Sequence, residues 1–271
     1  MILFPHSKIN LGLNVIEKRK DGFHNIETVF YPVKLYDVLE IIENKSFRKK
    51  DKKLYFQVSG IKIPNHRGAN LCEKAYYALD SKFDLPPLKM HLHKSIPIGS
   101  GLGGGSADCA FTLQMICKLF KLKINKTQLI KTASALGSDC PFFLETGAVF
   151  GTGKGDILKP CLVDLSLYNI FLVCPKIHVA TKEAYKSIKP ARSEESLKNL
   201  IKLHPSHWKG KIKNDFEIGV FKKHPELKKI KEHLYKKGAL YSSMSGSGSS
   251  VYGVYEKKTK MNFKNCDCFW V

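Results

Sequence analysis

The sequence lacks any uninterrupted apolar stretch of about 18 residues, the length that crosses a membrane, so we expect no membrane partner. Its N-terminus also lacks the basic-then-apolar order of a secretory signal. Its eight cysteines are too few for a disulfide-rich scaffold in a chain of 271 residues. Most of them lie among apolar neighbours, so we interpret them as reduced and buried and expect a cytoplasmic protein.

Acidic residues are scarce beside basic ones, with 24 Asp and Glu against 45 Lys and Arg and a formal net charge of +21. This excess predicts an anionic partner, either a nucleic acid or a small polyphosphate. The lysines are spread along the chain with one dense run, 45–53, which we interpret as a solvated hairpin loop. Because no zinc finger and no aromatic-rich RNA-binding motif is present, we expect no nucleic-acid partner.

The most informative feature is the glycine-rich segment Pro97-Ile98-Gly99-Ser100-Gly101-Leu102-Gly103-Gly104-Gly105-Ser106-Ala107-Asp108. Five glycines in seven residues are too flexible for the interior of a strand or helix. An apolar helical pattern follows directly, and Ser106 and Asp108 are typical of a helix start. Backbone N–H groups at the start of a helix converge on an anion, so we predict a phosphate loop rather than a mobile linker.

Two familiar nucleotide-binding motifs fit the chain poorly. The spacing of Gly99, Gly101 and Gly104 matches G-x-G-x-x-G, but the segment 118–126 offers no acid to hold a ribose. Around Lys154, a second glycine segment lacks the hydroxyl with which a Walker loop binds magnesium. We therefore expect neither a dinucleotide-binding fold nor a Walker ATPase, and we interpret Lys154 as a turn residue.

Hydrophobic periodicity predicts a chain of mixed strands and helices. Expected strands lie at 8–15, 54–58, 88–92 and 170–173, and two more flank a second glycine–serine loop at 245–249. Expected helices lie at 70–82, directly after the phosphate loop, and at 127–136, 181–188, 196–203 and 216–237. The segment 151–155 is a candidate seam between two halves.

Several segments, in order along the chain, resemble motifs of the GHMP kinase superfamily. They are 7–13 (SKINLGL) with 18–24 (KRKDGFH), the loop 97–108, 136–141 (LGSDCP), 214–217 (NDFE) and 244–248 (MSGSG). Within the superfamily, the first two segments resemble the kinases that phosphorylate 4-diphosphocytidyl-2-C-methyl-D-erythritol, an intermediate of non-mevalonate isoprenoid and terpenoid biosynthesis.

The resemblance implies an α+β fold of two domains. The expected N-terminal domain, 1–155, binds ATP and is similar to domain 2 of ribosomal protein S5. The expected C-terminal domain, 156–271, is ferredoxin-like. The implied activity transfers the γ-phosphate of ATP to the 2-hydroxyl of the substrate. The alternatives are another small-alcohol kinase of the superfamily and a basic, non-catalytic nucleic-acid binder.

The resemblance also implies which residues hold ATP and Mg²⁺. The expected ATP-binding residues form the loop: Pro97, Ile98, Gly99, Ser100, Gly101, Leu102, Gly103, Gly104, Gly105, Ser106 and Ala107. The hydroxyl of Ser106 is additionally expected to face magnesium. Relatives commonly carry a second serine at the position of Ala107, so a backbone N–H or a water molecule must serve there.

Two residues are the implied catalytic pair. Asp139 is the expected base, which accepts the proton of the attacking alcohol. Lys8 is expected beside it, where its charge keeps Asp139 ionised and lowers the pKa of the hydroxyl. Without the resemblance, Asp139 also fits an N-cap for a short helix at Pro141, and Lys8 fits a solvated lysine on a strand.

The remaining implied residues bind a small-molecule substrate that carries a cytidine diphosphate group. Phe23, where relatives carry Tyr, is expected to stack on cytosine, and His24 to bond its polar edge. Asn10 shares the face of Lys8 and is expected to bind the hydroxyls of the acceptor. Thr181 is expected near the substrate, although it also fits a helix N-cap, and His24 also fits an ordinary turn. We expect a monomer or a weak homodimer.

Overall fold

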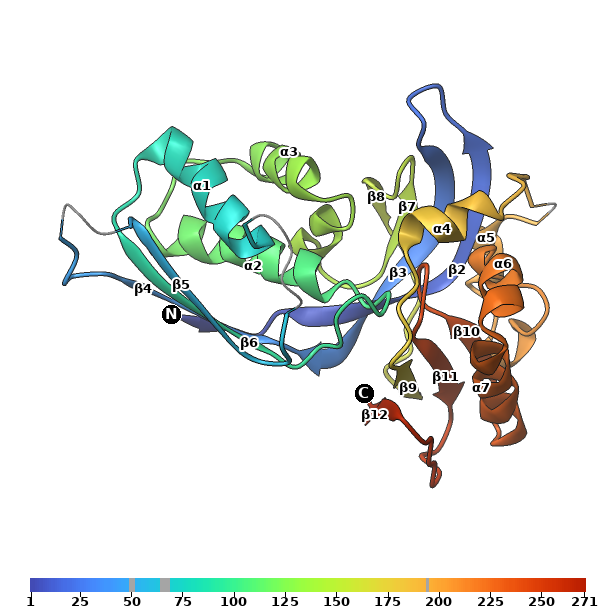
Figure 1. The fold of residues 1–271 in the computed structure, drawn as a ribbon. Helices are drawn as coiled ribbons and strands as arrows, with labels where there is room; N and C mark the ends of the chain where they lie inside the picture. The colour runs from blue at the N-terminus through green and yellow to red at the C-terminus, as the bar shows by residue number, and fades with distance from the viewer. Residues whose placement is uncertain (49–51, 64–68, 194) are drawn as a thin grey trace. The chain divides into compact units, whose positions relative to one another are not determined.

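The computed structural model describes residues 1–48, 52–63, 69–193 and 195–271, and the chain divides into two compact units (Figure 1). Unit 1 contains 1–7, 34–98 and 103–146, whereas unit 2 contains 8–33, 99–102 and 147–271. The chain therefore passes between the units repeatedly. The domain boundary expected after residue 155 stays a prediction, and the compact units divide the chain differently.

Unit 1 is a four-stranded sheet with helices on one side (Figure 1). The strand order is β1 (Ile2–Leu3), β4 (Val38–Glu43), β6 (Leu88–Lys94) and β5 (Leu54–Gly60). Only the β5–β6 pair of this sheet is parallel. The helices are α1 (Leu71–Phe83), α2 (Gly104–Leu119), α3 (Lys126–Leu136) and the 3-10 turn η1 (Cys140–Leu144).

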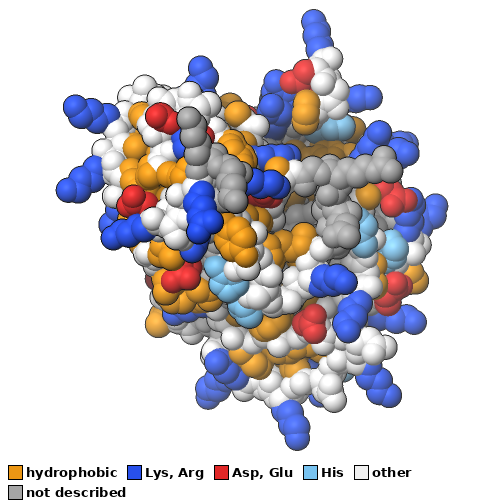
Figure 2. All heavy atoms as spheres, turned by 60° about the vertical axis from the view of Figure 1, so that its left-hand side comes forward, with side chains coloured by type: hydrophobic (Ala, Val, Ile, Leu, Met, Phe, Trp, Pro, Cys, Tyr) orange, Lys and Arg blue, Asp and Glu red, His pale blue; other side chains and the backbone are white. Residues whose placement is uncertain are grey.

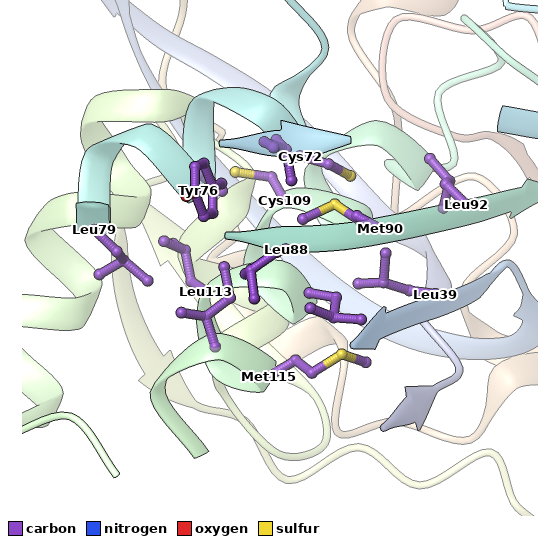
Figure 3. Packing of buried hydrophobic residues seen from close by; sticks show 14 of the residues in the cluster. Leu39, Cys72, Tyr76, Leu79, Leu88, Met90, Leu92, Cys109, Leu113 and Met115 are labelled. Atoms are coloured by element: carbon purple, nitrogen blue, oxygen red, sulfur yellow. The ribbon is translucent and has the colours of Figure 1, made fainter. Parts of the chain in front are cut away.

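The core of unit 1 lies between the sheet and these helices (Figure 3). Leu88, Met90 and Leu92 alternate along β6 and point inward, as the predicted period of two requires. Residues such as Tyr76 of α1 and Leu113 of α2 cover them. Two of the helices begin with capping boxes, in which the side chains of Asn70 and Glu73, and of Asn125 and Gln128, bond the free backbone N–H groups.

Unit 2 contains two four-stranded sheets. The first has the order β2 (His6–Lys18), β3 (His24–Tyr36), β7 (Val149–Thr152) and β8 (Ile157–Pro160). The second has the order β10 (Tyr241–Met244), β11 (Val251–Tyr255), β9 (Asn169–Pro175) and β12 (Cys266–Trp270). The helical elements are α4 (Thr181–Lys186), α5 (Leu197–Leu200), η2 (Pro205–His207), α6 (Phe216–Lys223) and α7 (Pro225–Lys236).

Two local predictions were wrong. The helix expected over 216–237 is interrupted at His224, because Pro225 lacks an N–H and starts a new helix. The helix expected over 196–203 is only one turn, α5. The segment 151–155, expected as a seam between two halves, forms the end of β7 and the turn into β8.

All eight cysteines are free, as predicted, and four of them are buried. Of the basic run 45–53, residues 49–51 lie outside the described residues. The Lys and Arg side chains on the face that Figure 2 shows are scattered over it and do not form one continuous patch. Among the described helices, none has both the length and the apolar character that crossing a membrane requires.

Candidate active site

The predicted phosphate loop connects β6 to α2. Gly99, Gly101 and Gly103 adopt positive φ angles of 65°, 79° and 74°, which side chains with a Cβ rarely adopt. Helix α2 begins at Gly104 with Gly103 as its N-cap, so Ser106 lies within the first turn and is not the cap that the sequence suggested. The cap makes no side-chain hydrogen bond, which leaves the first N–H groups of α2 suited to an anion.

The second glycine–serine loop, 245–249, lies against the first within unit 2. The carbonyl oxygen of Gly101 accepts a hydrogen bond from Ser245 Oγ at 2.9 Å, and Ser250 N donates to Ser100 O at 3.0 Å. A Cβ atom on Gly101 would lie 2.1 Å from the backbone oxygen of Ser245, closer than any real contact. The two loops therefore contact each other closely, and the contact depends on glycine at position 101.

The segment 214–217 fixes the second loop, a role that the sequence analysis did not assign. Asn214 Nδ2 donates to the backbone oxygens of Met244 and Gly246, each at 2.8 Å. Glu217 Oε1 accepts from Met244 N at 2.8 Å. These bonds hold the end of β10 at the start of the loop, so the motif NDFE positions the loop by side-chain hydrogen bonds to its backbone.

Lys8 lies on β2 with only 3% of its surface exposed, so its interpretation as a solvated strand lysine was wrong. Its Nζ donates to Asn10 Oδ1 at 2.6 Å and to Gly101 O at 2.9 Å. The ammonium group also lies 5.5 Å from the ring centre of Phe30. A buried positive charge therefore sits directly beneath the backbone of the phosphate loop in unit 2.

Asn10 lies on the same face of β2 as Lys8, as the strand period predicted, and it is buried. Its Nδ2 donates to Thr28 Oγ1 at 2.9 Å, and its backbone oxygen accepts from Tyr252 Oη at 2.8 Å. Both ends of the Asn10 amide thus have protein partners. Its expected contact with the hydroxyls of an acceptor stays a prediction.

Asp139 is the N-cap residue of η1 in unit 1, the position that the alternative interpretation expected, but its side chain makes no capping hydrogen bond to that turn. The loop that carries Asp139 lies against the first turn of α2. A Cβ on Gly137 would lie 3.9 Å from Ser106 Oγ and 3.0 Å from Cys140 Sγ. Hydrogen bonds from Cys109 and then Ser106 lower the pKa of Cys140.

A buried ionic triad underlies the start of α2 in unit 1, and the sequence analysis missed it. Lys94 Nζ lies 2.7 Å from Asp108 Oδ2 and also pairs with Asp37. Asp37 Oδ1 accepts from the backbone N–H groups of Ser95 and Ile96, just before the phosphate loop. Burial raises the pKa of Asp108 to about 7. The triad ties the end of β6 to the helix that follows the loop.

The residues expected to recognise cytosine lie where β3 begins. Phe23 is 58% exposed, and Lys154 Nζ lies 4.8 Å from its ring centre. His24 stacks on Tyr185 of α4, with ring centres 4.6 Å apart and planes 17° from parallel. Burial, and then the charge of Lys18, lower the pKa of His24, which favours its neutral form. Tyr185 was not among the residues predicted from the sequence, although it lies within the helix expected over 181–188.

Thr181 is the first residue of α4, and its N-cap is Ala180, so the N-cap interpretation of Thr181 was wrong. Its hydroxyl lies 3.1 Å from Ser247 Oγ of the second glycine–serine loop. Thr181 therefore connects the helix that carries Tyr185 to that loop. Unit 2 thus brings together Lys8, part of the phosphate loop, the second loop and an aromatic pair.

Comparison with known proteins identifies the family. The GHMP kinases N terminal domain matches residues 70–147, and the GHMP kinases C terminal domain matches 188–263. The 4-diphosphocytidyl-2-C-methyl-D-erythritol kinase of Parabacteroides distasonis is 48% identical, covering 99% of this chain and 97% of the relative. The enzyme of that name from Cytophaga hutchinsonii is 46% identical, covering 98% and 96%.

Solved structures agree with this assignment and with the predicted α+β fold. A crystal structure of 4-(cytidine 5'-diphospho)-2C-methyl-D-erythritol kinase has a TM-score of 0.78 and 29% identity, covering 94% of this chain and 90% of that one. A mevalonate kinase, at 12% identity, shares the fold with a TM-score of 0.69 and coverage of 100% and 98%. Given the identity along nearly its whole length, this chain belongs to the family of 4-diphosphocytidyl-2-C-methyl-D-erythritol kinases among the GHMP kinases.

Proposed function

We propose that this protein transfers the γ-phosphate of ATP to the 2-hydroxyl of 4-diphosphocytidyl-2-C-methyl-D-erythritol, a step of non-mevalonate isoprenoid synthesis. One observation carries the proposal beyond family membership. His24 and Tyr185 form an aromatic pair in the same compact unit as Lys8 and Gly101 of the phosphate loop. A flat, partly apolar group of this kind suits a nucleobase.

ATP binds through the glycine-rich loop in this proposal. Left-handed glycines let the backbone approach the phosphates closely, and the free N–H groups of α2 add the positive end of its dipole. The second loop supports the first through Ser245 and Gly101. Phosphoryl transfer needs such positioning and charge neutralisation more than covalent help from the protein.

Asp139 acts as the base that accepts the proton of the substrate hydroxyl, and Lys8 is its electrostatic partner, whose positive charge lowers the pKa of that hydroxyl. A positioned acid or base contributes about 10²–10⁴-fold to the rate. The ammonium of Lys8 is already oriented by Asn10 and Gly101. It therefore needs no reorganisation to act on a reacting group.

Magnesium fits this site as a companion of the ATP phosphates. The described residues contain no cluster of three or more His, Cys, Asp or Glu that could hold an ion alone. Magnesium bound to nucleotides takes only one or two protein oxygens, with phosphate and water completing its shell. Ser106 Oγ, beside the loop that carries Asp139, is the oxygen we assign to it. The ion would neutralise charge on the phosphates.

Two other functions compete with this one. Another small-alcohol kinase would share the phosphate loop and Lys8, but its acceptor would leave the pair of His24 and Tyr185 without a base to recognise. A nucleic-acid binder would use a continuous basic surface, and the basic residues on the face in Figure 2 are dispersed. We place the reaction in the cytoplasm, where its cysteines would stay reduced.

An ADP-release assay with three acceptors tests the proposal. The purified chain is given ATP, Mg²⁺ and either 4-diphosphocytidyl-2-C-methyl-D-erythritol, mevalonate or galactose. We expect release of ADP only with the first acceptor. Equal or faster release with mevalonate or galactose would assign the chain to another alcohol. No release with any acceptor, in a preparation that binds ATP, would refute the activity.

A further inference from the structure

We propose that Thr28 is a positioning residue for the phosphoryl transfer, because it sets the orientation of the Asn10 amide that holds Lys8. The inference rests on the proposed function, since it assumes that the ammonium of Lys8 takes part in the reaction. Thr28 lies on β3 and none of its surface is exposed. It has no place among the residues that contact ATP or substrate in the proposal above.

The hydroxyl of Thr28 has one proton, and a hydrogen bond within the protein already uses it. Thr28 Oγ1 donates to the backbone oxygen of Gly12 at 2.6 Å. A hydroxyl that has given its only proton to a carbonyl acts as an acceptor toward its other neighbours. The group that approaches Thr28 Oγ1 from Asn10, at 2.9 Å, must therefore be the N–H₂ end of the amide.

The orientation of Asn10 follows from this assignment. With Nδ2 at Thr28, the amide presents Oδ1 to Lys8 Nζ, at 2.6 Å. The opposite orientation would place the N–H₂ group against the ammonium, donor facing donor, and would leave Thr28 without a donor. Gly12, Thr28, Asn10 and Lys8 thus form one directed chain of hydrogen bonds.

Burial makes the direction of these hydrogen bonds costly to reverse. Asn10 and Lys8 are 1% and 3% exposed, so water has little access to replace a lost partner. Tyr252 also holds the backbone of Asn10 in place through its hydroxyl. The lysine stem has four rotatable bonds, and a fixed amide oxygen contributes, together with Gly101 O, to selecting one position for its ammonium. Thr28 therefore acts on Lys8 indirectly, through its hydrogen bond to Asn10 and the hydrogen bond of Asn10 to Lys8.

The experiment compares three substitutions in the full chain. Thr28→Val keeps the shape but removes the hydroxyl, and Thr28→Ser keeps the hydroxyl. Thr132→Val is the matched control, because Thr132 is also buried and donates to a backbone oxygen, that of Gln128 at 3.0 Å in α3. For each variant, kcat and the KM for ATP and for the cytidyl substrate are measured, together with Tm.

We expect Thr28→Val to lower kcat about tenfold, which corresponds to about 1.4 kcal/mol, with both KM values within about twofold of wild type. Thr28→Ser should keep kcat within about twofold, and Thr132→Val should lower Tm without lowering kcat. A merely structural role predicts instead that kcat follows Tm. Wild-type kcat in Thr28→Val, an equal loss in Thr28→Ser, or an equal loss in Thr132→Val would each overturn the inference.

A double-mutant cycle separates this inference from the proposed function. Once Lys8 is replaced in Lys8→Met, adding Thr28→Val should cost less than about twofold more in kcat, because the ammonium that Thr28 positions is gone. A full additional tenfold loss would show that Thr28 acts by another route. Wild-type turnover in Lys8→Met alone would refute the proposed role of Lys8 itself.

Discussion

His24 and Tyr185 stack face to face, with ring centres 4.6 Å apart and planes 17° from parallel. They come from β3 and α4, elements separated by more than half of the chain. Tyr185 also meets the ring of Phe216 edge-on at 4.8 Å, which fixes the tyrosine from its other side. A rigid aromatic face beside a neutral histidine combines stacking with a hydrogen-bonding edge, the two contacts that a pyrimidine offers.

Removing either ring should impair binding of the cytidyl substrate and not of ATP. We expect Tyr185→Leu and His24→Ala each to raise the KM for that substrate about tenfold or more, since base stacking on an aromatic side chain is worth about 1–3 kcal/mol. Tyr185→Phe keeps the ring and should stay close to wild type. Steady-state kinetics with each substrate varied in turn provides the measurement. Equal increases in both KM values would exclude a role in base recognition.

Asp139 and Lys8 should affect turnover far more than the binding of ATP. We expect Asp139→Asn and Lys8→Ala each to lower kcat at least about a hundredfold, within the range of a positioned acid–base group. Calorimetric titration with a non-hydrolysable ATP analogue should still show binding in both variants. A variant that turns over at the wild-type rate would remove that residue from the mechanism.

Local patterns predicted the neighbours on one strand but not their burial. The period of two placed Lys8 and Asn10 on one face of β2, and their polar ends lie 2.6 Å apart. The same pattern fitted a solvated lysine, because what buries Lys8 includes the carbonyl of Gly101, 93 residues away. Burial of a strand face is a tertiary property that no local period encodes.

The start of α1 could be predicted because its signal is local in the sequence, whereas the ionic triad could not. The capping box of α1 uses Asn70 and Glu73, three residues apart, so it is visible in the sequence. Lys94 instead pairs with acids 57 and 14 residues away, on segments that meet only in the folded unit. The resemblance supplied Asp139 as a candidate base, whereas the structure supplied the supporting contacts around the loop.

Gly101→Ala should weaken both stability and ATP binding. The substitution adds a Cβ that would lie 2.1 Å from Ser245 O, and it places alanine at a φ of +79°. The positive φ alone costs about 1–2 kcal/mol. Gly210→Ala is the matched control, because Gly210 has a φ of +81° and a Cβ added there would meet no atom of the described residues within 4 Å.

Thermal unfolding and the KM for ATP distinguish the two glycine variants. Both should lower Tm through the strained backbone, and only Gly101→Ala should also raise the KM for ATP, by about tenfold or more, because the two loops must separate. If Gly101→Ala behaved like Gly210→Ala in both measurements, the contact between the loops would have no part in ATP binding.

Asp108→Asn should change how stability depends on pH. Burial is the main cause that raises the pKa of Asp108 to about 7 from 3.8, Lys94 opposes the shift, and Asp37 adds to it. Cys72 also faces the group from α1, in thiol form because its own pKa is raised. Because the folded protein holds this proton more tightly than the unfolded chain does, the stabilisation is complete below about pH 4 and is lost as pH rises through 7.

Asparagine keeps an oxygen for Lys94 and needs no proton. The variant should therefore not lose stability as the pH rises through 7. We expect the Tm of Asp108→Asn, relative to wild type, to rise by roughly 3–6 °C between pH 5 and pH 8. Asp84→Asn is the control: Lys53 lowers the pKa of Asp84, so that its contribution is already constant over this range. Parallel Tm curves for wild type and Asp108→Asn would mean that Asp108 stays ionised in the folded protein throughout, with Lys94 outweighing its burial.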